Sequence, residues 1–544
     1  MRFVNARRFR SRKSPQNVRS RGHRSLFEPL HSQNDQANNL FENESPMKEI
    51  RLPSLPANQD AGPLLAAALR EIHPGPGRIV FEPGRHDFFP ETSEAVWLNA
   101  ANHDNARVPV ACPLRGFQGL ELCGDQAEWV LHGRMSALAA NGCSGLRLSG
   151  VAVRSETPYV VEGRIRDNNG DAVVVTLAAP HACVVRDGYA VFRDDAFAGQ
   201  RAYLQLQNFH PDTGLLPEDA PDNFGSFFPN RAEALDRRTV RLFLERQDLR
   251  PGWPMALKTE RRWTPAIALD HCEDTRITDC AVGDAGGMGI IAQFCTDLEL
   301  LRVEVAPPPG SGRRISVQDD ASHFVHCRGH LVLKDCVFER QWDDAVNIHG
   351  TFRKQQVRLS AKECMVANMH FQQMGLETCH PGDRVSLRRA DTLRPVFESE
   401  VEDVFTINPQ FSRLTLREAL PEDLAGGLVW GNESWHPEVT IEGCRFAESI
   451  PRGVLIQSNR PSRIRDCHFR NLPGQVVATP AEANFWYEGA GGTDLRIAGN
   501  TVENCGYNPN FLGGADLFDF RIHAPGEDPD FAYHRNIVVE NNGI

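Results

Sequence analysis

The chain has 544 residues, of which 41% are hydrophobic and 24% charged, so two to four domains or one long repeat array is expected. This composition excludes wholesale disorder, and no apolar run reaches the roughly 18 residues that cross a bilayer. The net charge of −12 disfavours nucleic acid as a partner, because phosphate binding requires a basic surface. These properties predict no oligomeric state.

The first 46 residues form a separate N-terminal region. Nine of the first 24 residues are Lys or Arg, and no acidic residue precedes Glu28, which is typical of a disordered basic tail; a nucleic-acid-binding arm and an organelle transit peptide are the alternatives. Because the region lacks the apolar core of a secretory signal, the chain as written is expected in the cytoplasm, and export is the alternative if the true N-terminus differs. Periodic structure begins only after Met47, where we expect translation to start.

Fourteen cysteines are spread along the chain without any C-x-x-C pair. Zinc-ribbon and thioredoxin-like sites are therefore not supported. We expect buried free thiols in a reducing compartment.

Short segments with alternating apolar residues recur at intervals in the low twenties. Cys444 and Cys467, for example, occupy equivalent places in VTIEGCRFAE and SRIRDCHFRN and lie 23 residues apart. A β-strand repeat of this period indicates a solenoid, and the period-2 alternation excludes helical repeats. The predicted fold is all-β, a right-handed parallel β-helix with coils about 4.8 Å apart and with Cys and Asn side chains stacked at the corners. The repeated segments are 120–124, 146–153, 275–284, 298–305, 330–339, 439–448, 462–471 and 495–504.

Two regions interrupt this period, and both have the pattern of antiparallel strands joined by polar loops. They predict two small β-barrel or sandwich insertions in loops of the β-helix. The predicted domains are the tail 1–46, a cap with the first coils at 47–154, an insertion at 155–262, central coils at 263–350, an insertion at 351–434 and C-terminal coils at 435–544.

Two Asp-Asp pairs mark the candidate catalytic site. Asp320 precedes Asp343 and Asp344 by 23 and 24 residues, which places them on adjacent coils at nearly the same angular position. With the reach of the side chains, carboxyl groups about 6–9 Å apart are feasible, which suits inverting glycoside hydrolysis; retaining hydrolysis needs about 5–5.5 Å, and spacing alone excludes neither. Like charges on neighbouring coils raise one pKa and produce a protonated acid beside an ionised base.

Two other interpretations of the acid pairs remain open from the sequence. The pairs could cap solvent-exposed turns, or they could form a Ca²⁺ site, because hard cations take oxygen ligands. His323, Asn347 and His349 argue against both, since donors beside acids resemble a set that binds sugar hydroxyls. We assign no metal ligands.

Several motifs along the chain resemble glycoside hydrolase family 110, the α-1,3-galactosidases. AGGMGIIAQ at 285–293 and DDAVNIHG at 343–350 are the specific ones, and the resemblance runs from residue 77 to about 505. The other matching stretches are FEPGRHDFFPE (81–91), NHDN (102–105), LHGRM (131–135), PPPGSGRRIS (307–316), DDASHFVHCRG (319–329) and ANFWYEG (483–489).

The resemblance implies a parallel β-helix with inserted β domains and exo-cleavage of terminal α-1,3-linked galactose with inversion, without a cofactor. It also implies a partner that is a glycan with terminal α-galactose, of the blood group B type or of the linear Gal-α1,3-Gal type. Its catalytic residues carry over to Asp320, Asp343 and Asp344, whereas Asp319 is not assigned. The loops that would determine acceptor preference match weakly, and the family's frequent export signal is not visible here.

By analogy with polygalacturonases, Asp343 is predicted to be the general acid, and Asp320 and Asp344 to hold and deprotonate the attacking water. Trp486 is predicted to stack on galactose, with a core aromatic as the alternative, and Glu488 to fix a hydroxyl group or an arginine. The remaining candidate hydroxyl contacts are Gln293, His323, Asn347 and His349.

Other functions are compatible with the predicted fold. A polygalacturonase-like hydrolase is one, and a Ca²⁺-dependent lyase, which would need a basic catalytic residue, is another; the net charge of −12 weakens both as polyuronate enzymes. A non-catalytic glycan-binding β-solenoid is the third.

Overall fold

In the computed structural model, the described residues are 47–192, 205–221, 231–259, 261–377, 379–424, 426–489, 491–511, 514, 516–526 and 528–544. The predictions for 1–46, including a start at Met47, lie outside them. Nearly all regular structure is β, apart from helix α1 (Gly62–Ile72) and the short 3₁₀ helix η1 (Phe371–Gln373). Among these residues no helix is both long and apolar enough to cross a membrane.

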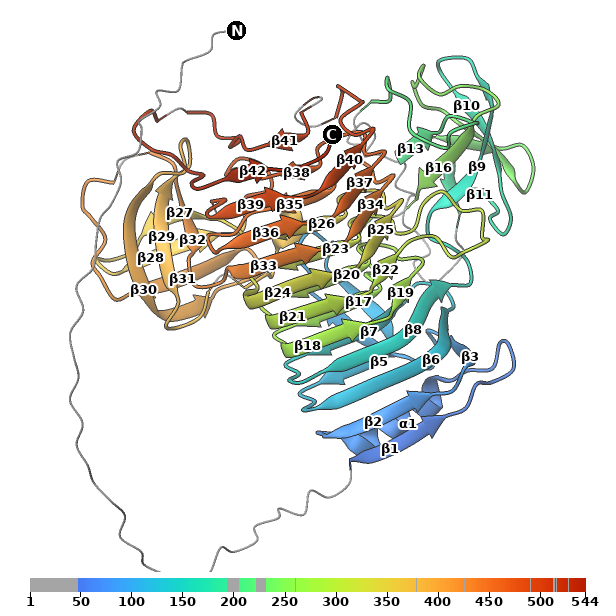
Figure 1. Cartoon of the computed structure of the whole chain (residues 1–544), viewed down its shortest axis with the longest axis horizontal. Coiled ribbons are helices and arrows are strands. Elements are labelled where there is room, and N and C mark those ends of the chain that lie inside the picture. The colour runs from blue at the N-terminus through green and yellow to red at the C-terminus, as the bar shows by residue number, and fades with distance from the viewer. Residues whose placement is uncertain are drawn as a thin grey trace, which may run out of the picture. The chain divides into compact units, whose positions relative to one another are not determined.

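Stacked coils form a parallel β-helix from residue 48 to the C-terminal residues (Figure 1), as the repeat predicts. Eighteen of its strands form one sheet. They are β1 (Lys48–Leu52), β2 (Gly77–Phe81), β3 (Gly84–Phe88), β6 (Leu120–Leu131), β8 (Arg147–Ser155), β18 (Glu273–Thr278), β19 (Ala281–Val282), β21 (Thr296–Leu301), β22 (Glu304–Val305), β24 (Arg328–Lys334), β25 (Val337–Glu339), β33 (Pro437–Glu442), β34 (Arg445–Ala447), β36 (Ser462–Arg465), β37 (His468–Arg470), β39 (Leu495–Ala498), β40 (Thr501–Glu503) and β42 (Val538–Glu540).

A second sheet of ten strands carries the candidate site. Its strands alternate between the two faces, so Ala292, Phe324 and Ile348 pack in the core while His323 and Asn347 lie on the opposite face. The strands are β4 (Glu94–Leu98), β5 (Ala106–Arg115), β7 (Ser136–Asn141), β17 (Ile267–Asp270), β20 (Ile290–Gln293), β23 (Ser322–Val325), β26 (Val346–His349), β35 (Val454–Ile456), β38 (Val477–Ala478) and β41 (Phe518–Asp519).

Cysteine and asparagine side chains form the predicted ladders at the coil corners. The Cys336 amide donates to Cys444 Sγ at 3.4 Å, and the Cys467 amide donates to Asn500 Oδ1 at 2.9 Å. All fourteen cysteines are free, and most are buried. Backbone turns with positive φ precede these cysteines at Asp335, Gly443 and Asp466, a conformation that Gly and Asp adopt more readily than most residues.

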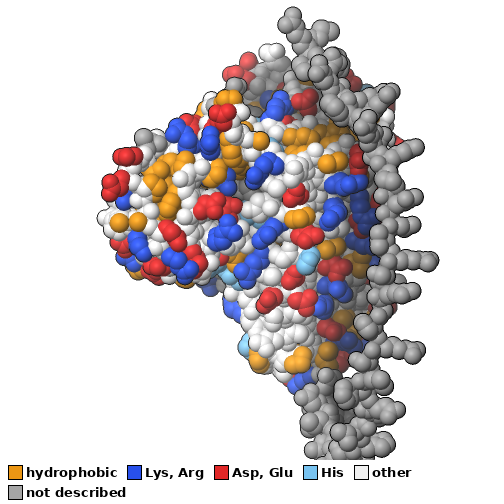
Figure 2. All heavy atoms as spheres, turned by 60° about the vertical axis from the view of Figure 1, so that its left-hand side comes forward, with side chains coloured by type: hydrophobic (Ala, Val, Ile, Leu, Met, Phe, Trp, Pro, Cys, Tyr) orange, Lys and Arg blue, Asp and Glu red, His pale blue; other side chains and the backbone are white. Residues whose placement is uncertain are grey.

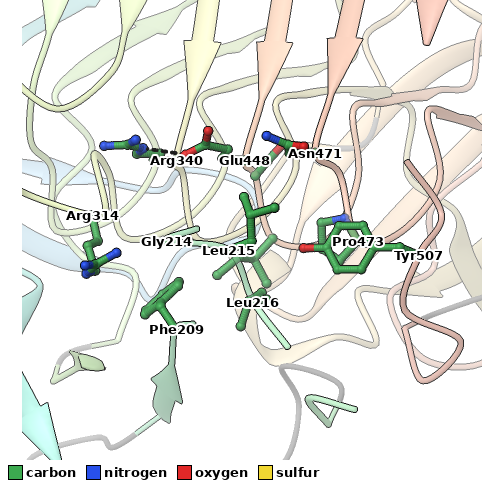
Figure 3. A pocket seen from close by; sticks show the side chains of 12 residues that line it. Phe209, Gly214, Leu215, Leu216, Arg314, Arg340, Glu448, Asn471, Pro473 and Tyr507 are labelled. Carbon is green, nitrogen blue, oxygen red and sulfur yellow. Dashed lines mark hydrogen bonds and ion pairs between the residues drawn. The ribbon is translucent and has the colours of Figure 1, made fainter. Parts of the chain in front are cut away.

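The chain leaves the coils after β8 and forms a six-stranded antiparallel sheet with an added hairpin. Leu215 and Leu216, in a loop of this excursion, face Glu448 and Tyr507 of the coils across a small pocket (Figure 3), and Leu216 packs in one apolar cluster with Trp342. The sheet strands are β9 (Val161–Asn168), β10 (Val173–Leu177), β13 (Gln205–Asn208), β14 (Ala232–Ala234), β15 (Thr239–Leu242) and β16 (Pro254–Lys258), and the hairpin is β11 (Val184–Arg186) with β12 (Tyr189–Val191).

A second excursion, between β26 and β33, forms a closed six-stranded barrel around its own apolar cluster. On the face shown in Figure 2, acidic and basic side chains are interspersed over the surface. The barrel strands are β27 (Arg353–Arg358), β28 (Glu363–Ala367), β29 (Arg384–Arg389), β30 (Pro395–Thr406), β31 (Phe411–Leu416) and β32 (Leu428–Asn432).

Aromatic stacking inside the coils makes a test of their stability possible. Phe446 is fully buried and stacks on Phe338 and Phe469, with ring centroids 5.6 and 4.6 Å apart. Phe446→Ala is expected to lower the free energy of unfolding by about 3–5 kcal/mol, because it removes buried surface and leaves a cavity. Urea titration followed by circular dichroism measures this loss.

Phe405→Ala is the matched control, because Phe405 lies on the barrel with 57% of its surface exposed. It should change stability by no more than about 0.5 kcal/mol. Equal losses in the two variants would contradict the assignment of Phe446 to the solenoid core.

Candidate functional site

Register between three strands aligns the charged residues of the site. The first residues of β23, β26 and β35 are paired with one another. The residues two positions earlier, Asp320, Asp344 and Arg452, therefore occupy equivalent places on successive coils. Asp343 lies one residue before Asp344, at the same turn.

The three predicted catalytic carboxylates converge. One oxygen each from Asp320, Asp343 and Asp344 lies within 4.8 Å of the others, because the side chains of both coils turn into one cavity. This cavity has a volume of about 370 Å³. Its other lining residues are Asn102, Arg262, Asn347, Arg452, Leu455, Gln457, Pro480, Glu482, Asn484, Phe485, Trp486, Glu488 and His523.

Two arginines offset the negative charge of the cluster. Arg452 donates from Nε and Nη2 to the two oxygens of Asp344, at 2.8 and 2.9 Å, and Arg262 Nη2 donates to Asp343 Oδ2 at 2.6 Å. Such charge-assisted bonds are strong. A hard cation could take the three carboxylates as ligands, but it would have to compete with both guanidinium groups, so the site favours a neutral, hydroxyl-rich ligand.

Asp319, which the sequence leaves unassigned, positions Arg262. Its buried carboxylate accepts from Lys258 Nζ and forms an ion pair with Arg262 Nε at 2.8 Å. Burial opposes ionisation, but Arg262 and Lys258 still hold the pKa of Asp319 below its ordinary value. The Arg262 guanidinium therefore spans Asp319 and Asp343.

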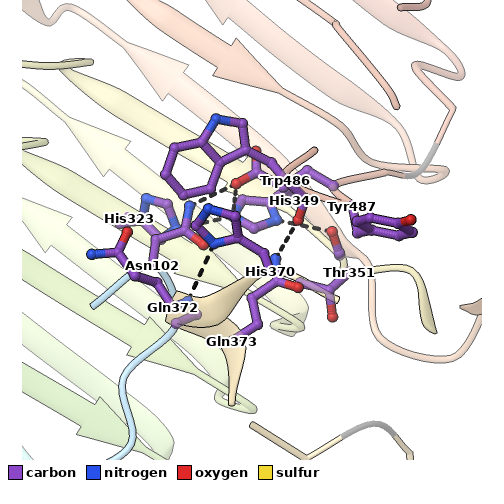
Figure 4. Close-up of polar contacts among 12 residues, drawn as sticks. Asn102, His323, His349, Thr351, His370, Gln372, Gln373, Trp486 and Tyr487 are labelled. Atoms are coloured by element: carbon purple, nitrogen blue, oxygen red, sulfur yellow. Dashed lines mark hydrogen bonds and ion pairs between the residues drawn. The ribbon is translucent and has the colours of Figure 1, made fainter. Parts of the chain in front are cut away.

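A hydrogen-bonded chain runs from Asp320 beneath the cavity floor. Asp320 Oδ2 lies 2.6 Å from His323 Nδ1, the Nε2 atoms of His323 and His349 are 2.9 Å apart, and His349 Nδ1 donates to the Gly350 carbonyl at 2.8 Å. Both imidazoles are buried, and they lie behind His370 and Trp486 in Figure 4. Neither imidazole lines the cavity; they approach it through Asp320 and through Glu488, whose Oε1 lies 3.6 Å from His349 Nε2.

The pKa directions define the protonation state of this chain. Burial, reinforced by the charges of Asp343 and Asp344, raises the pKa of Asp320 well above its ordinary value, while burial and the neighbouring His349 lower the pKa of His323 well below 6.5. These directions fit one arrangement: Asp320 carries a proton that it donates to neutral His323, and His323 Nε2–H donates to His349.

The other two carboxylates differ in their electrostatic surroundings. Burial raises the pKa of Asp343 to about 6, with Arg262 acting in the opposite direction and Asp344 adding to the rise. Burial also raises the pKa of Asp344, and the bidentate Arg452 limits that rise. Asp343 is the most accessible of the three, with 15% of its side chain exposed against 3% and 2% for Asp320 and Asp344.

Three amide oxygens at the cavity have no hydrogen-bond partner among the described residues. They are Asn347 Oδ1, Asn102 Oδ1 and Gln457 Oε1, all buried. The Asn102 amide nitrogen is used, because it donates to Glu488 Oε1 at 2.6 Å. Since buried polar atoms are normally paired, these oxygens are positioned to accept from ligand hydroxyl groups.

Gln293 does not line this cavity. Its Oε1 accepts from the Ala101 amide at 3.1 Å and its Nε2 donates to the Asn99 carbonyl at 2.9 Å. Both polar atoms of the Gln293 amide thus hold the loop that presents Asn102. Asn347, Trp486 and Glu488 do line the cavity, whereas His323 and His349 lie below it.

The wall around Trp486 is built by segments far apart in the sequence (Figure 4). The His370 ring lies 4.0 Å from the Trp486 ring, and Gln373 Nε2 donates to the Trp486 carbonyl at 2.6 Å. Glu482 accepts from the amides of 484, 485 and 487 at 2.6–2.7 Å. Trp486 is therefore held in place by the barrel and by its own loop.

Sequence reasoning missed the residues that complete this site. Lys258 ends β16 and Arg262 follows it, at the end of the first excursion, and Arg452 lies on the first coil after the barrel. The alignment of Arg452 with Asp344 needs the register across an 84-residue insertion, 351–434, which no local pattern supplies. NHDN (102–105) was the one available signal, for Asn102.

Replacing Asp319 tests whether the buried ion-pair cluster supports the site. Asp319→Asn is expected to lower the free energy of unfolding by about 3–5 kcal/mol, because Lys258 would keep a buried charge without its carboxylate partner and Arg262 would lose one of its two. Denaturant titration measures the loss. Asp279→Asn, at the exposed pair with Arg302, is the control and should cost no more than about 1 kcal/mol; a loss of that size for Asp319→Asn would show that the buried cluster is not needed.

The fold and the cavity define a parallel β-helix protein with an acidic site, and relatives of one kind match it. The family model described as GLAA-B beta-barrel domain II matches residues 363–427, within the barrel. "Alpha-1,3-galactosidase A" of Shewanella woodyi is 29% identical over 499 residues, which cover 89% of this chain and 79% of the relative. "Alpha-1,3-galactosidase B" of Bacteroides thetaiotaomicron is 23% identical over 477 residues, with coverage of 86% and 77%.

Solved structures give weaker matches. The A-module of a mannuronan C-5 epimerase from Azotobacter vinelandii is 8% identical, with a TM-score of 0.29 and coverage of 89% of this chain and 92% of that one. An exopolygalacturonase of Yersinia enterocolitica is 9% identical, with a TM-score of 0.27 and coverage of 92% and 79%.

Proposed function

We propose that this protein is an exo-acting glycoside hydrolase of family 110 that removes terminal α-1,3-linked galactose from glycans with inversion of configuration. The convergence of Asp320, Asp343 and Asp344 in one cavity is the observation that carries the proposal. The relatives named alpha-1,3-galactosidase, which match most of the chain, support the substrate class.

Asp343 is the general acid in this proposal. It is the most accessible carboxyl group of the three, and a pKa of about 6 leaves it protonated in mildly acidic solution, as proton donation to a leaving oxygen requires. Arg262 holds the carboxyl group in place through the 2.6 Å bond.

Asp344 is the base, because the bidentate Arg452 favours its ionised form. Asp320, whose proton is directed to His323, keeps its other oxygen to accept a hydrogen bond from the attacking water. The water proton passes to Asp344 as the oxygen bonds to the anomeric carbon. The bond from that carbon to the glycosidic oxygen breaks, and Asp343 gives its proton to the leaving oxygen.

Galactose binding uses the groups that the structure leaves available. Asn347 Oδ1 and Asn102 Oδ1 accept from sugar hydroxyl groups, and Trp486 stacks on the apolar face of the ring. These three residues contact only the galactose. They do not contact the rest of the glycan, whether it belongs to a linear α-Gal or to a blood group B structure.

Substitution of Asp343 tests its role. Asp343→Asn should lower kcat/KM on Gal-α1,3-Gal by about 10²–10⁴-fold but spare most activity on 2,4-dinitrophenyl α-galactoside, whose leaving group needs no proton.

For the native enzyme, kcat/KM on the disaccharide should fall as pH rises above about 6, because Asp343 loses its proton with a pKa near this value. Initial rates on the two substrates across pH 4–9 measure both effects.

Asn347→Asp serves as the matched substitution at a binding residue, and it should lower the rates on both substrates together. Equal losses of both activities in Asp343→Asn would contradict the general-acid assignment. Cleavage of polygalacturonate in preference to the disaccharide would contradict the substrate class.

A further inference from the structure

A second group of convergent side chains lies outside the sugar cavity, where the barrel meets the coils. His271 directly follows β17, and Glu377 and His380 lie between η1 and β29. Glu377 Oε2 is 3.0 Å from His271 Nε2 and 2.9 Å from His380 Nε2, and the three donor atoms lie within 4.8 Å of one another. Tetrahedral zinc with bonds of about 2.0–2.1 Å requires ligand atoms roughly 3.3 Å apart, close to these separations.

Each histidine of the group has its other ring nitrogen directed at a further carboxylate. His271 Nδ1 lies 2.9 Å from Asp270 Oδ1, and His380 Nδ1 lies 3.7 Å from Asp383 Oδ2. Metal-binding histidines almost always have such a partner, which fixes the tautomer and the direction of the ring. The arrangement leaves both Nε2 atoms for the shared point beside Glu377.

These outer carboxylates are themselves anchored. Asp270 Oδ2 accepts from Asn141 Nδ2 at 2.8 Å, and Asp383 accepts from Asn432 Nδ2 at 2.9 Å and from Trp435 Nε1 at 3.1 Å. The supporting groups therefore come from the coils on one side and from the barrel and the segment after it on the other.

A buried aromatic ring fixes both imidazoles. Phe294 is 2% exposed; the His271 ring stacks on it at 5.2 Å and 11°, and the His380 ring meets it edge-on at 5.1 Å and 81°. The two ligating rings are thus oriented by packing before any ion binds, and such preorganisation is what a precise site requires.

We propose that His271, Glu377 and His380 bind one divalent transition-metal ion, for which Zn²⁺ is best suited, with water as the fourth ligand. Two imidazoles and one carboxylate form a donor set that Zn²⁺ accepts, unlike the all-oxygen set of Ca²⁺. The ion would fasten the barrel to the β-helix.

The ion's position links it to the wall of the sugar cavity. Glu377 and His380 close the segment that begins with η1, and from η1 Gln372 Nε2 donates to Asp104 Oδ1 at 2.9 Å and Gln373 Nε2 to the Trp486 carbonyl. The ion therefore stabilises this wall and takes no part in bond cleavage. The sequence predicted no metal ligands, because His271 is separated by more than 100 residues from the short Glu-x-x-His at 377–380.

Metal titration of the tag-free full-length protein tests the proposal. After treatment with EDTA and buffer exchange, calorimetry with ZnCl₂ should show one strong site per chain, and Co²⁺ should give the visible absorption of a four-coordinate ion. Asp270→Asn should weaken Zn²⁺ binding by about 10–100-fold, and Glu377→Gln and His380→Ala should weaken it at least as much.

Glu503→Gln is the matched control. It removes the carboxylate of an exposed pair in which His468 Nε2 lies 3.2 Å from Glu503 Oε2, and it should leave Zn²⁺ affinity unchanged. The proposal is overturned if the native protein binds no Zn²⁺, which would leave an ion-pair cluster only, or if Glu377→Gln and His380→Ala bind it as tightly as the native protein. Galactose release by the EDTA-treated enzyme at 25 °C should persist whether or not the protein binds Zn²⁺. The outcome of the metal titration is therefore independent of the proposed hydrolase activity.

Discussion

In-register stacking of β23, β26 and β35 is the constraint on which the site depends. Because paired strands of a parallel sheet keep equivalent residues about 4.8 Å apart, the residues before these strands are brought together without any local motif. Asp320, Asp344 and Arg452 are aligned in this way on three successive coils. Asp343 directly precedes Asp344 on the second of these coils. A slip of one residue in β26 would turn Asn347 into the core and Ile348 towards the cavity.

Charge balance explains how four aspartates at one corner of two adjacent coils coexist in a buried site. Asp319 forms ion pairs with Lys258 and Arg262, and Asp344 forms one with Arg452. Asp320 carries a proton, which it donates to His323, and therefore adds no negative charge. Asp343 lies between these groups, and burial raises its pKa to about 6. Different surroundings for identical side chains are what separates an acid from a base in a hydrolase.

The parallel β-helix and the carboxylate cluster were predictable from the sequence, because both depend on a period in the low twenties that survives in segments such as 439–448 and 462–471. The cationic partners were not, since Arg262 reaches Asp343 only after the first excursion and Arg452 follows the barrel. Gln293 shows the other limit: it was predicted as a hydroxyl contact because its amide offers a donor and an acceptor, but that amide is used by the backbone of Asn99 and Ala101. To predict that the backbone and not a ligand uses the Gln293 amide, one needs the path of a loop that lies almost 200 residues earlier in the chain.

The central claim is that the three converging carboxylates direct water to the anomeric carbon of a terminal α-1,3-linked galactose. Proton NMR during hydrolysis of Gal-α1,3-Gal tests it most directly, because the anomer released first is visible before mutarotation. We expect β-galactose to appear first. Release of α-galactose first would contradict the inverting arrangement of Asp320, Asp343 and Asp344, and the absence of any release would contradict the galactosidase itself.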